Sequence, residues 1–381
     1  KVKVISSKPV SRDELYDLFL SILEVHGYTA VRSGNVVRVI QSKDARSSPV
    51  AVAEESLSLP DLFRMVDPAV VEIATVQQMA ADQGPARRVK SGGLGSGFLI
   101  SADGRIMTAS HVVQVADELQ VRFVTGDVVK ARVLASDPSA DVALIQAESV
   151  PSGIKPAALG DSTNAAIGDQ IFVIGAPYGI AHSLSVGHIS GRRTPTQLFG
   201  GFEQVELLQT DAAINQGNSG GPMFNMRGEV IGVVSHIFST SGGSMGLGFV
   251  VTSNLAMRVL IDDPTTWTGL DGVLVEGQLA AALNIPQAAG IVIEAVAAGS
   301  PASALGLRPG NLKAQIGDQS LTLGGDIVLS IHGIRVGESD YQQKMRERGK
   351  ALGENDKVVV TVLRRGEIVT LSNLVHVLYR N

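Results

Sequence analysis

The chain has 381 residues, of which 44% are hydrophobic and only 4% aromatic, and its formal net charge is −5. One hydrophobic core rarely serves so long a chain, so the length predicts two or three domains. The acidic balance argues against nucleic acid as a partner. The absence of cysteine excludes disulfides and thiolate metal sites. No motif calls for a metal or a cofactor, and no apolar run approaches the ~18 residues of a membrane-spanning helix.

The N-terminal region predicts a strand, a helix and a hairpin. Residues 2–5 alternate in polarity as a strand does. Ser11 and Glu14 form a capping box ahead of apolar residues at helical spacing. Two short apolar runs within residues 28–40 then flank a Ser-Gly-Asn turn and predict a hairpin.

Residues 14–45 resemble the N-terminal periplasmic domain of type II secretion secretins, of which residues 1–41 are expected to be a part. The chain begins with Lys1 and shows no signal segment, so its N-terminus is expected to be processed or cut. The resemblance implies docking onto secretion-system components. A packing module without a partner and an artificial fusion are the alternatives. Residues 42–62 are polar, contain prolines and are expected to be a linker.

The most informative pattern is Gly-Asn-Ser-Gly-Gly-Pro at residues 217–222. Glycines allow steep backbone angles and leave room for a substrate backbone. The backbone of Gly217, Asn218 and Ser219 is the expected oxyanion hole, with the N–H groups of Gly217 and Ser219 as donors. A serine hydroxyl is a weak nucleophile by itself, so catalysis also needs a base and an acid. By contrast, the glycines of residues 92–97 lack the spacing and the following helix of a nucleotide loop.

His111 is the candidate base because it follows a predicted strand, residues 105–108, which would hold its ring rigidly. Asp141 enters an apolar run, where an unpaired carboxylate is costly to bury. A histidine N–H is its natural partner, since the acid then sets the tautomer and stabilises the imidazolium. The chain order His, Asp, Ser is that of the chymotrypsin-like class. The alternatives that stay open are His182 and His188 for the base, and Asp161 and Asp211 for the acid.

Six segments resemble, in order, the HtrA/Deg serine proteases. They are residues 108–111, 140–144, 159–162, 174–179, 209–215 and 217–222. The resemblance runs from about residue 66 to 254. The chain departs from the family at Ala109-Ser110, where an asparagine pair is usual, and at Ala176 and Tyr178, where the family has asparagine and phenylalanine. Neither departure touches the three candidate catalytic residues.

This resemblance implies a mostly β, chymotrypsin-like double β-barrel over residues 63–263, and assembly as a trimer. In the family, the residue five positions before the serine lines the primary specificity pocket. That residue is Ile214 here, with Leu247 as an expected second wall. Aliphatic walls without an acid favour a small aliphatic side chain before the cut, such as Val, Ala or Ile.

Residues 264–381 resemble the PDZ domain that follows the protease in HtrA/Deg enzymes, with a helix expected near 339–348 and a hairpin over 357–371. The segments that carry the resemblance are residues 299–302, 306–310 and 325–334. It implies that Trp267, Thr268, Gly269 and Leu270 form a loop that binds the C-terminal carboxylate of a peptide. Interdomain packing is the alternative role for Trp267, and His332 is expected in a turn.

The expected protein is therefore a periplasmic, ATP-independent and homo-oligomeric serine endopeptidase. It would cleave unfolded or misfolded proteins by an acyl-enzyme mechanism, in quality control linked to type II secretion. The alternative is a catalytically silent chaperone or scaffold that docks to the secretion machinery.

Overall fold

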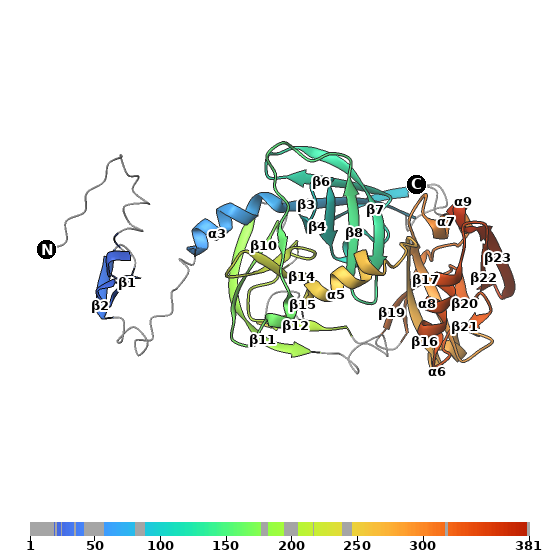
Figure 1. Cartoon of the computed structure of the whole chain (residues 1–381). Helices are drawn as coiled ribbons and strands as arrows, with labels where there is room; N and C mark the ends of the chain where they lie inside the picture. Colours follow the sequence, from blue (N-terminus) through green and yellow to red (C-terminus); the bar gives the residue numbers. More distant parts are fainter. Residues whose placement is uncertain are drawn as a thin grey trace. The chain divides into compact units, whose positions relative to one another are not determined.

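The computed structural model gives the chain as two compact units, residues 1–58 and 59–381, which are described in turn (Figure 1). The described residues are 19, 21–23, 25–33, 36–41, 57–80, 88–176, 182–193, 205–215, 217–237, 246–316 and 319–378. Among these residues no helix is long and apolar enough to cross a bilayer.

The first unit contains the predicted hairpin. Strand β1 (Tyr28–Ser33) pairs antiparallel with β2 (Val36–Gln41), in a register that sets Ser33 opposite Val36. Phe19, residues 21–23 and Val25 are helical, as the apolar spacing predicts. The predicted first strand and the capping box lie outside the described residues.

The second unit begins with helix α3 (Leu59–Val66), so the last residues of the predicted linker are helical. Leu62 and Val66 recur at helical spacing and are almost fully buried in the core. A 3₁₀ turn, η1 (Asp67–Ala69), then leads into the first strand. The apolar face of this helix, which packs on the core, explains why regular structure starts before residue 63.

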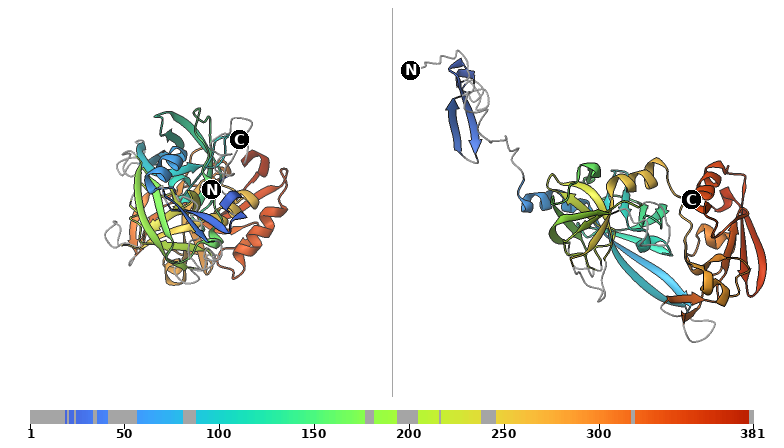
Figure 2. Two further views of the ribbon diagram at one scale, coloured as in Figure 1. Left: turned by 60° about the vertical axis from the view of Figure 1, so that its left-hand side comes forward. Right: turned by 90° about the horizontal axis from the view of Figure 1, so that it is seen from below.

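The first β-barrel is closed by six strands in the order β3-β4-β5-β8-β7-β6. They are β3 (Val70–Ala80), β4 (Arg88–Leu99), β5 (Arg105–Thr108), β6 (Glu118–Phe123), β7 (Val128–Asp137) and β8 (Val142–Ala147), with the short helix α4 (Ser110–Val113) after β5. Strict exposed–buried alternation along β6 puts its apolar residues inside. Figure 2 shows β3 and β4 as a long two-stranded ladder, paired from Val70 with Phe98 to Ala80 with Arg88.

The second barrel forms in a seven-stranded sheet in the order β13-β10-β11-β12-β15-β14-β9, in which β13 also pairs with β14 and so closes six strands. The strands are β9 (Ala158–Leu159), β10 (Gln170–Gly175), β11 (Ser183–Arg193), β12 (Leu207–Thr210), β13 (Pro222–Asn225), β14 (Glu229–Ile237) and β15 (Gly248–Thr252), with the 3₁₀ turn η2 (Ser162–Asn164) after β9. Residues of both barrels share one buried cluster, in which Phe172 and Phe224 stack with centroids 5.1 Å apart. This cluster joins the barrels, and the mostly β double-barrel fold is confirmed.

Helix α5 (Ser253–Met257) and the π-helical turn η4 (Arg258–Asp262) lead to a third sheet, in the order β16-β17-β20-β22-β23 with β21 on β20, and a separate β18-β19 hairpin. The elements of this C-terminal module, in chain order, are β16 (Leu270–Glu276), α6 (Gly277–Ala282), β17 (Ala289–Val296), α7 (Pro301–Leu305), β18 (Leu312–Ile316), β19 (Gln319–Leu323), β20 (Ile327–Ile331), β21 (Ile334–Arg335), α8 (Tyr341–Ala351), β22 (Lys357–Arg364), β23 (Glu367–Leu374) and α9 (Val375–Leu378). The predicted helix and hairpin are present as α8 and β22–β23, whereas the PDZ assignment stays a prediction.

A largely buried ion pair joins two segments of this C-terminal module. Arg364 donates from Nε to Oδ1 of Asp326 and from an Nη group to Oδ2, both at 2.7 Å. The Asp326 side chain is 1% exposed and also accepts the N–H of Arg308. A buried carboxylate needs such partners, because its desolvation is otherwise uncompensated.

Candidate active site

The glycine-rich loop between β12 and β13 carries Ser219 at the seam between the two barrels. Gly220 has φ +83°, a conformation that side chains with a Cβ rarely adopt. A Cβ at Gly220 would lie 2.2 Å from Oγ1 of Thr108 and 2.3 Å from the carbonyl of Ser96. Any residue with a side chain at position 220 would therefore clash with the first barrel, and only glycine allows so close an approach.

His111 lies on the short helix α4, directly after β5, as the sequence predicts. Its Nδ1 is 2.9 Å from both carboxylate oxygens of Asp141, and its backbone N–H donates to Oδ1 at 3.0 Å. The ring is about half exposed. The carboxylate thus fixes the position of the helix start. It also fixes the orientation of the ring, whose Nδ1 edge faces Asp141.

A tight turn after β7 brings Asp141 to this position. Oδ1 of Asp137 accepts the N–H groups of Ser139 and Ala140, at 2.9 and 3.0 Å. Asp141 itself has φ +56°, a left-handed conformation that aspartate tolerates better than most residues. The turn lets the carboxylate face His111 while the next residue, Val142, is already part of β8.

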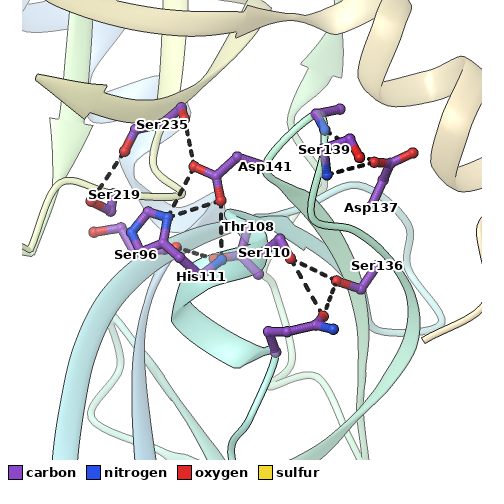
Figure 3. Close-up of polar contacts among 12 residues, drawn as sticks. Ser96, Thr108, Ser110, His111, Ser136, Asp137, Ser139, Asp141, Ser219 and Ser235 are labelled. Atoms are coloured by element: carbon purple, nitrogen blue, oxygen red, sulfur yellow. Dashed lines mark hydrogen bonds and ion pairs between the residues drawn. The ribbon is translucent and has the colours of Figure 1, made fainter. Parts of the chain in front are cut away.

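Ser235, on β14, joins the acid to the nucleophile (Figure 3). Its hydroxyl donates to Oδ2 of Asp141, and its carbonyl accepts the hydroxyl of Ser219 at 3.4 Å. A bond of this length is weak and constrains the serine hydroxyl little. In Figure 3 the imidazole of His111 is drawn between Asp141 and Ser219.

The charge of this pair shifts both pKa values. Burial alone lowers the pKa of the His111 imidazole, but the hydrogen bond and the negative charge of Asp141 outweigh it and raise that pKa above its ordinary value. Burial raises the pKa of the Asp141 carboxyl, but hydrogen bonds from His111 and Ser235 and the charge of the imidazolium lower it below the ordinary value. The pair is therefore stable as imidazolium and carboxylate, the state that a general base reaches after it accepts a proton.

The backbone N–H groups around the serine differ in their partners. The N–H of Asn218 donates to the carbonyl of Asn215 at 3.0 Å, so this predicted member of the oxyanion hole has its amide engaged in the loop. Among the described residues, no hydrogen-bond partner is found for the N–H groups of Gly217 and Ser219, so these two stay the predicted oxyanion donors. The carbonyl of Gly217 accepts the hydroxyl of Ser96.

The four alternative residues have other partners. His182 contacts Asp67, with Nδ1 and Oδ1 2.7 Å apart. Asp161 caps η2 and accepts from the side chain of Asn254 at 2.7 Å. The carboxylate of Asp211 accepts the backbone N–H of His188. His332 lies in a turn, with φ +53°.

The two predicted pocket residues differ in exposure. Ile214 is 2% exposed and belongs to the core of the second barrel, where Gly248 approaches its side chain. Leu247 is 37% exposed. The cleft that they would line stays a prediction.

The predicted peptide-binding loop lies at the junction of the first barrel and the C-terminal module. Trp267 packs against the core of the first barrel, and its Nε1 donates to the carbonyl of Gln114 at 3.0 Å. The side chain of Gln114 in turn donates to the carbonyl of Leu270 at 2.8 Å. Trp267 thus takes the interdomain position weighed as its alternative, while the carboxylate-binding role of the loop stays a prediction.

Sequence reasoning missed Gln114, Ser96 and Ser235. Gln114 accepts the hydroxyl of Ser136 at 2.7 Å and lies immediately after α4, three residues from His111. The sequence motifs give none of these three residues a role, because each one contacts residues that are distant in the sequence. Within the part of the chain that the structure describes, no group of three or more His, Asp or Glu side chains could hold a metal ion.

Residues 95–233 match the trypsin-like peptidase domain, and residues 1–39 match the GspD-like N0 domain. A probable periplasmic DegP-like serine endoprotease of Ectopseudomonas mendocina is 33% identical over 347 residues, which cover 80% of this chain and 71% of that protein. Its counterpart in Pseudomonas fulva is 34% identical over 324 residues, covering 81% and 65%. A variant of the HtrA-type protease AlgW, solved with a decapeptide, superposes with a TM-score of 0.50 at 26% identity, covering 84% of this chain and 97% of that one.

The double barrel and the peptidase-domain match define a trypsin-like serine endopeptidase. Within that class, the chain belongs to the HtrA family, with DegP-like endoproteases among its relatives. It spans about two thirds of the length of these relatives. Their names confirm the predicted periplasmic localisation.

Proposed function

We propose that the chain cleaves peptide bonds through an acyl-enzyme formed on Ser219, with His111 as general base and Asp141 as the acid that orients it. The hydroxyl oxygen attacks the scissile carbonyl while His111 takes its proton on Nε2. The imidazolium then gives this proton to the leaving amine. Water, activated by the same ring, hydrolyses the acyl-enzyme and restores the serine.

The tetrahedral intermediates place a negative charge on the former carbonyl oxygen. The N–H groups of Gly217 and Ser219 are the proposed donors to this oxyanion. Donors that are already oriented stabilise the transition state without reorganisation, and removal of one donor typically costs about 100- to 1000-fold in turnover.

The observation that carries the proposal is the His111–Asp141 pair, bonded at 2.9 Å through Nδ1, which leaves Nε2 as the acceptor for a serine proton. The test is a fluorophosphonate probe together with unfolded casein. The wild type should be labelled and should cleave casein, whereas Ser219→Ala should do neither. A wild type without labelling or cleavage, even with activating peptides, would refute the enzymatic function.

Small aliphatic residues are the proposed preference before the cut. Leu247 is partly exposed and aliphatic, and Ile214 lies buried nearby in the sequence-predicted pocket wall. A preference for basic residues would need a buried acid beside them. A peptide library that varies this position should give the highest kcat/KM for Val, Ala and Ile. A preference for Lys or Asp would contradict the assigned pocket.

The biological role that we propose is ATP-independent removal of unfolded or misfolded proteins in the periplasm, by a homo-oligomer. Residues 264–381 would act as a PDZ domain. Strand β16 is terminal in its sheet, and an extended peptide could add there with its carboxylate at residues 267–270. Fluorescence anisotropy with a labelled C-terminal peptide and its C-terminally amidated form tests this. Equal affinities would refute carboxylate recognition.

Docking to a type II secretion complex is the second proposed function, and the match of residues 1–39 to the GspD-like N0 domain favours it. The alternative within this proposal is a catalytically silent chaperone or scaffold that docks to the secretion machinery. Pull-downs from an extract, with the chain and with a chain that lacks residues 1–41, should differ in the secretion components recovered. Equal recovery would exclude docking through this region.

A further inference from the structure

Residues 95–97, Gly-Ser-Gly, lie on strand β4 directly against the nucleophile loop. A Cβ at Gly95 would lie 2.7 Å from both methyl groups of Val112 and 3.3 Å from the carbonyl of Ser219. A side chain at position 95 would thus clash with Val112 of α4 and crowd the loop, and the next residue, Ser96, contacts the loop directly.

Ser96 is fully buried and uses all of its hydrogen-bonding groups. Its hydroxyl donates to the carbonyl of Gly217 at 2.6 Å and accepts the N–H of Ala176 at 2.9 Å. Its backbone N–H donates to the carbonyl of Ser219 at 2.8 Å, and its carbonyl accepts the hydroxyl of Thr108 at 2.7 Å. One residue of the first barrel therefore binds the loop at two carbonyls, one on each side of the serine.

These two carbonyls bracket the peptide unit that contains the N–H of Ser219. A peptide unit is planar, so fixing the carbonyl of Gly217 also fixes the amide of Asn218, which is further held by the carbonyl of Asn215 at 3.0 Å. The carbonyl of Ser219 is fixed on the other side. The carbonyl of the unit between them, that of Asn218, also accepts the N–H of Gly221 at 2.8 Å. With both neighbouring planes held as well, little rotation is left to this unit, whose N–H is a proposed oxyanion donor.

We infer that Ser96 is a positioning residue for the oxyanion hole, which holds the N–H of Ser219 in the direction that the tetrahedral intermediate requires. The inference rests on the proposed acyl-enzyme function. Ser96 is fully buried, and it acts through the carbonyls of Gly217 and Ser219.

The test compares Ser96→Ala with Ser253→Ala in the full chain. Both serines are almost fully buried, and Ser253 donates to the carbonyl of Gly160 at 2.7 Å, a bond of the same kind away from the nucleophile loop. Active sites are titrated with a fluorophosphonate, and kcat and KM are then measured with a peptide ester. Loss of the Ser96 hydroxyl should lower kcat per titrated site about 10- to 100-fold, somewhat less than deletion of a donor.

The readouts separate positioning from a general loss of structure. Ser96→Ala should keep KM and the pH midpoint of kcat/KM, because binding and His111 are untouched, whereas Ser253→Ala should keep kcat as well. A purely structural role would reduce the number of titrated sites and the melting temperature but leave kcat per site unchanged, and this result would overturn the inference. An equal loss of kcat in Ser253→Ala would overturn it too.

Ser96→Cys provides a second test if the alanine variant folds poorly. A thiol has nearly the same shape but is a weak hydrogen-bond donor, so kcat per site should lie between those of wild type and Ser96→Ala. Wild-type kcat in a folded Ser96→Cys variant would count against the inference. A wild type that neither labels nor cleaves would instead refute the proposed function, and the inference with it.

Discussion

Replacement of Asp141 by asparagine changes one carboxylate oxygen to an NH₂ group and leaves the number of heavy atoms unchanged. Oδ1 accepts the backbone N–H of His111 at 3.0 Å, and Oδ2 accepts the hydroxyl of Ser235. In the variant, the side-chain oxygen of asparagine can keep the hydrogen bond from the backbone N–H of His111. The NH₂ group then takes the place of Oδ2 and faces Ser235 and Nδ1 of His111, which lies 2.9 Å from both carboxylate oxygens of Asp141. The hydroxyl of Ser235 can rotate to accept a hydrogen bond from this NH₂ group, so the variant is expected to fold.

An NH₂ donor at Nδ1 selects the tautomer of His111 that carries its proton on Nε2. That ring nitrogen then cannot accept the proton of Ser219. In Ser-His-Asp enzymes generally, this substitution lowers kcat by about 10⁴. The same contacts are present here, so we expect a loss of that order, or about 5.4 kcal/mol in activation free energy.

The assay measures kcat and KM with a chromogenic aliphatic peptide, normalised to folded protein by circular dichroism and thermal melting. Asp161→Asn is the matched control, because Asp161 is another hydrogen-bonded carboxylate but binds Thr163 and Asn254. It should keep wild-type kcat. A folded Asp141→Asn variant that loses less than about 10-fold, or 1.4 kcal/mol, would refute the assigned acid. A comparable loss in the control would refute the choice between the two carboxylates.

The other predictions concern pH, stability and peptide binding. The kcat/KM of the wild type should rise with pH through a midpoint above the ordinary histidine pKa of about 6.5, because neutral His111 is the base and its pKa is raised. A midpoint of kcat/KM below about pH 6.5 would contradict the raised pKa. The stability that the His111 imidazolium contributes is complete below about pH 6.5 and is lost as the pH rises through the raised pKa. The difference in melting temperature between wild type and His111→Gln should therefore narrow over the pH range in which activity appears. Arg364→Ala leaves Asp326 buried without its cation, and urea denaturation should report a loss of about 3–5 kcal/mol; a loss under about 1 kcal/mol would show that the pair is solvated. Gln114→Ala frees the carbonyl of Leu270, and a C-terminal peptide should bind about 5-fold more tightly by anisotropy, the equivalent of one neutral hydrogen bond; an unchanged Kd would argue against a peptide site at this carbonyl.

Local patterns in the sequence predict much of the fold. The hairpin of residues 28–41 follows from two apolar runs around a Ser-Gly-Asn turn. Helix α8 agrees with the helix that the PDZ resemblance implies. Residues 59–62 at the end of the expected linker belong to helix α3, which begins at Leu59. There the burial of an apolar helix face against the barrels outweighs the polar and proline-rich composition of the preceding residues.

The candidate triad could be proposed from the sequence because each member lies in a distinctive local context. His111 follows a strand, Asp141 precedes an apolar run and Ser219 is flanked by glycines. The sequence could not choose the partner of the indole of Trp267. That choice depends on the first barrel, whose Gln114 carbonyl accepts its N–H.

The sequence alone therefore determined the class of chemistry, the order of the three candidate residues and the β-rich architecture. Only the tertiary structure revealed that Ser96 holds the loop of Ser219, through a hydroxyl bond across 121 positions of the chain, and that Ser235 bonds Asp141 across 94. A serine in a strand carries no local signal of its partner, because that partner is supplied by the closure and docking of the two barrels. Residue types and their spacing specify what each segment can do, and packing decides which segments meet.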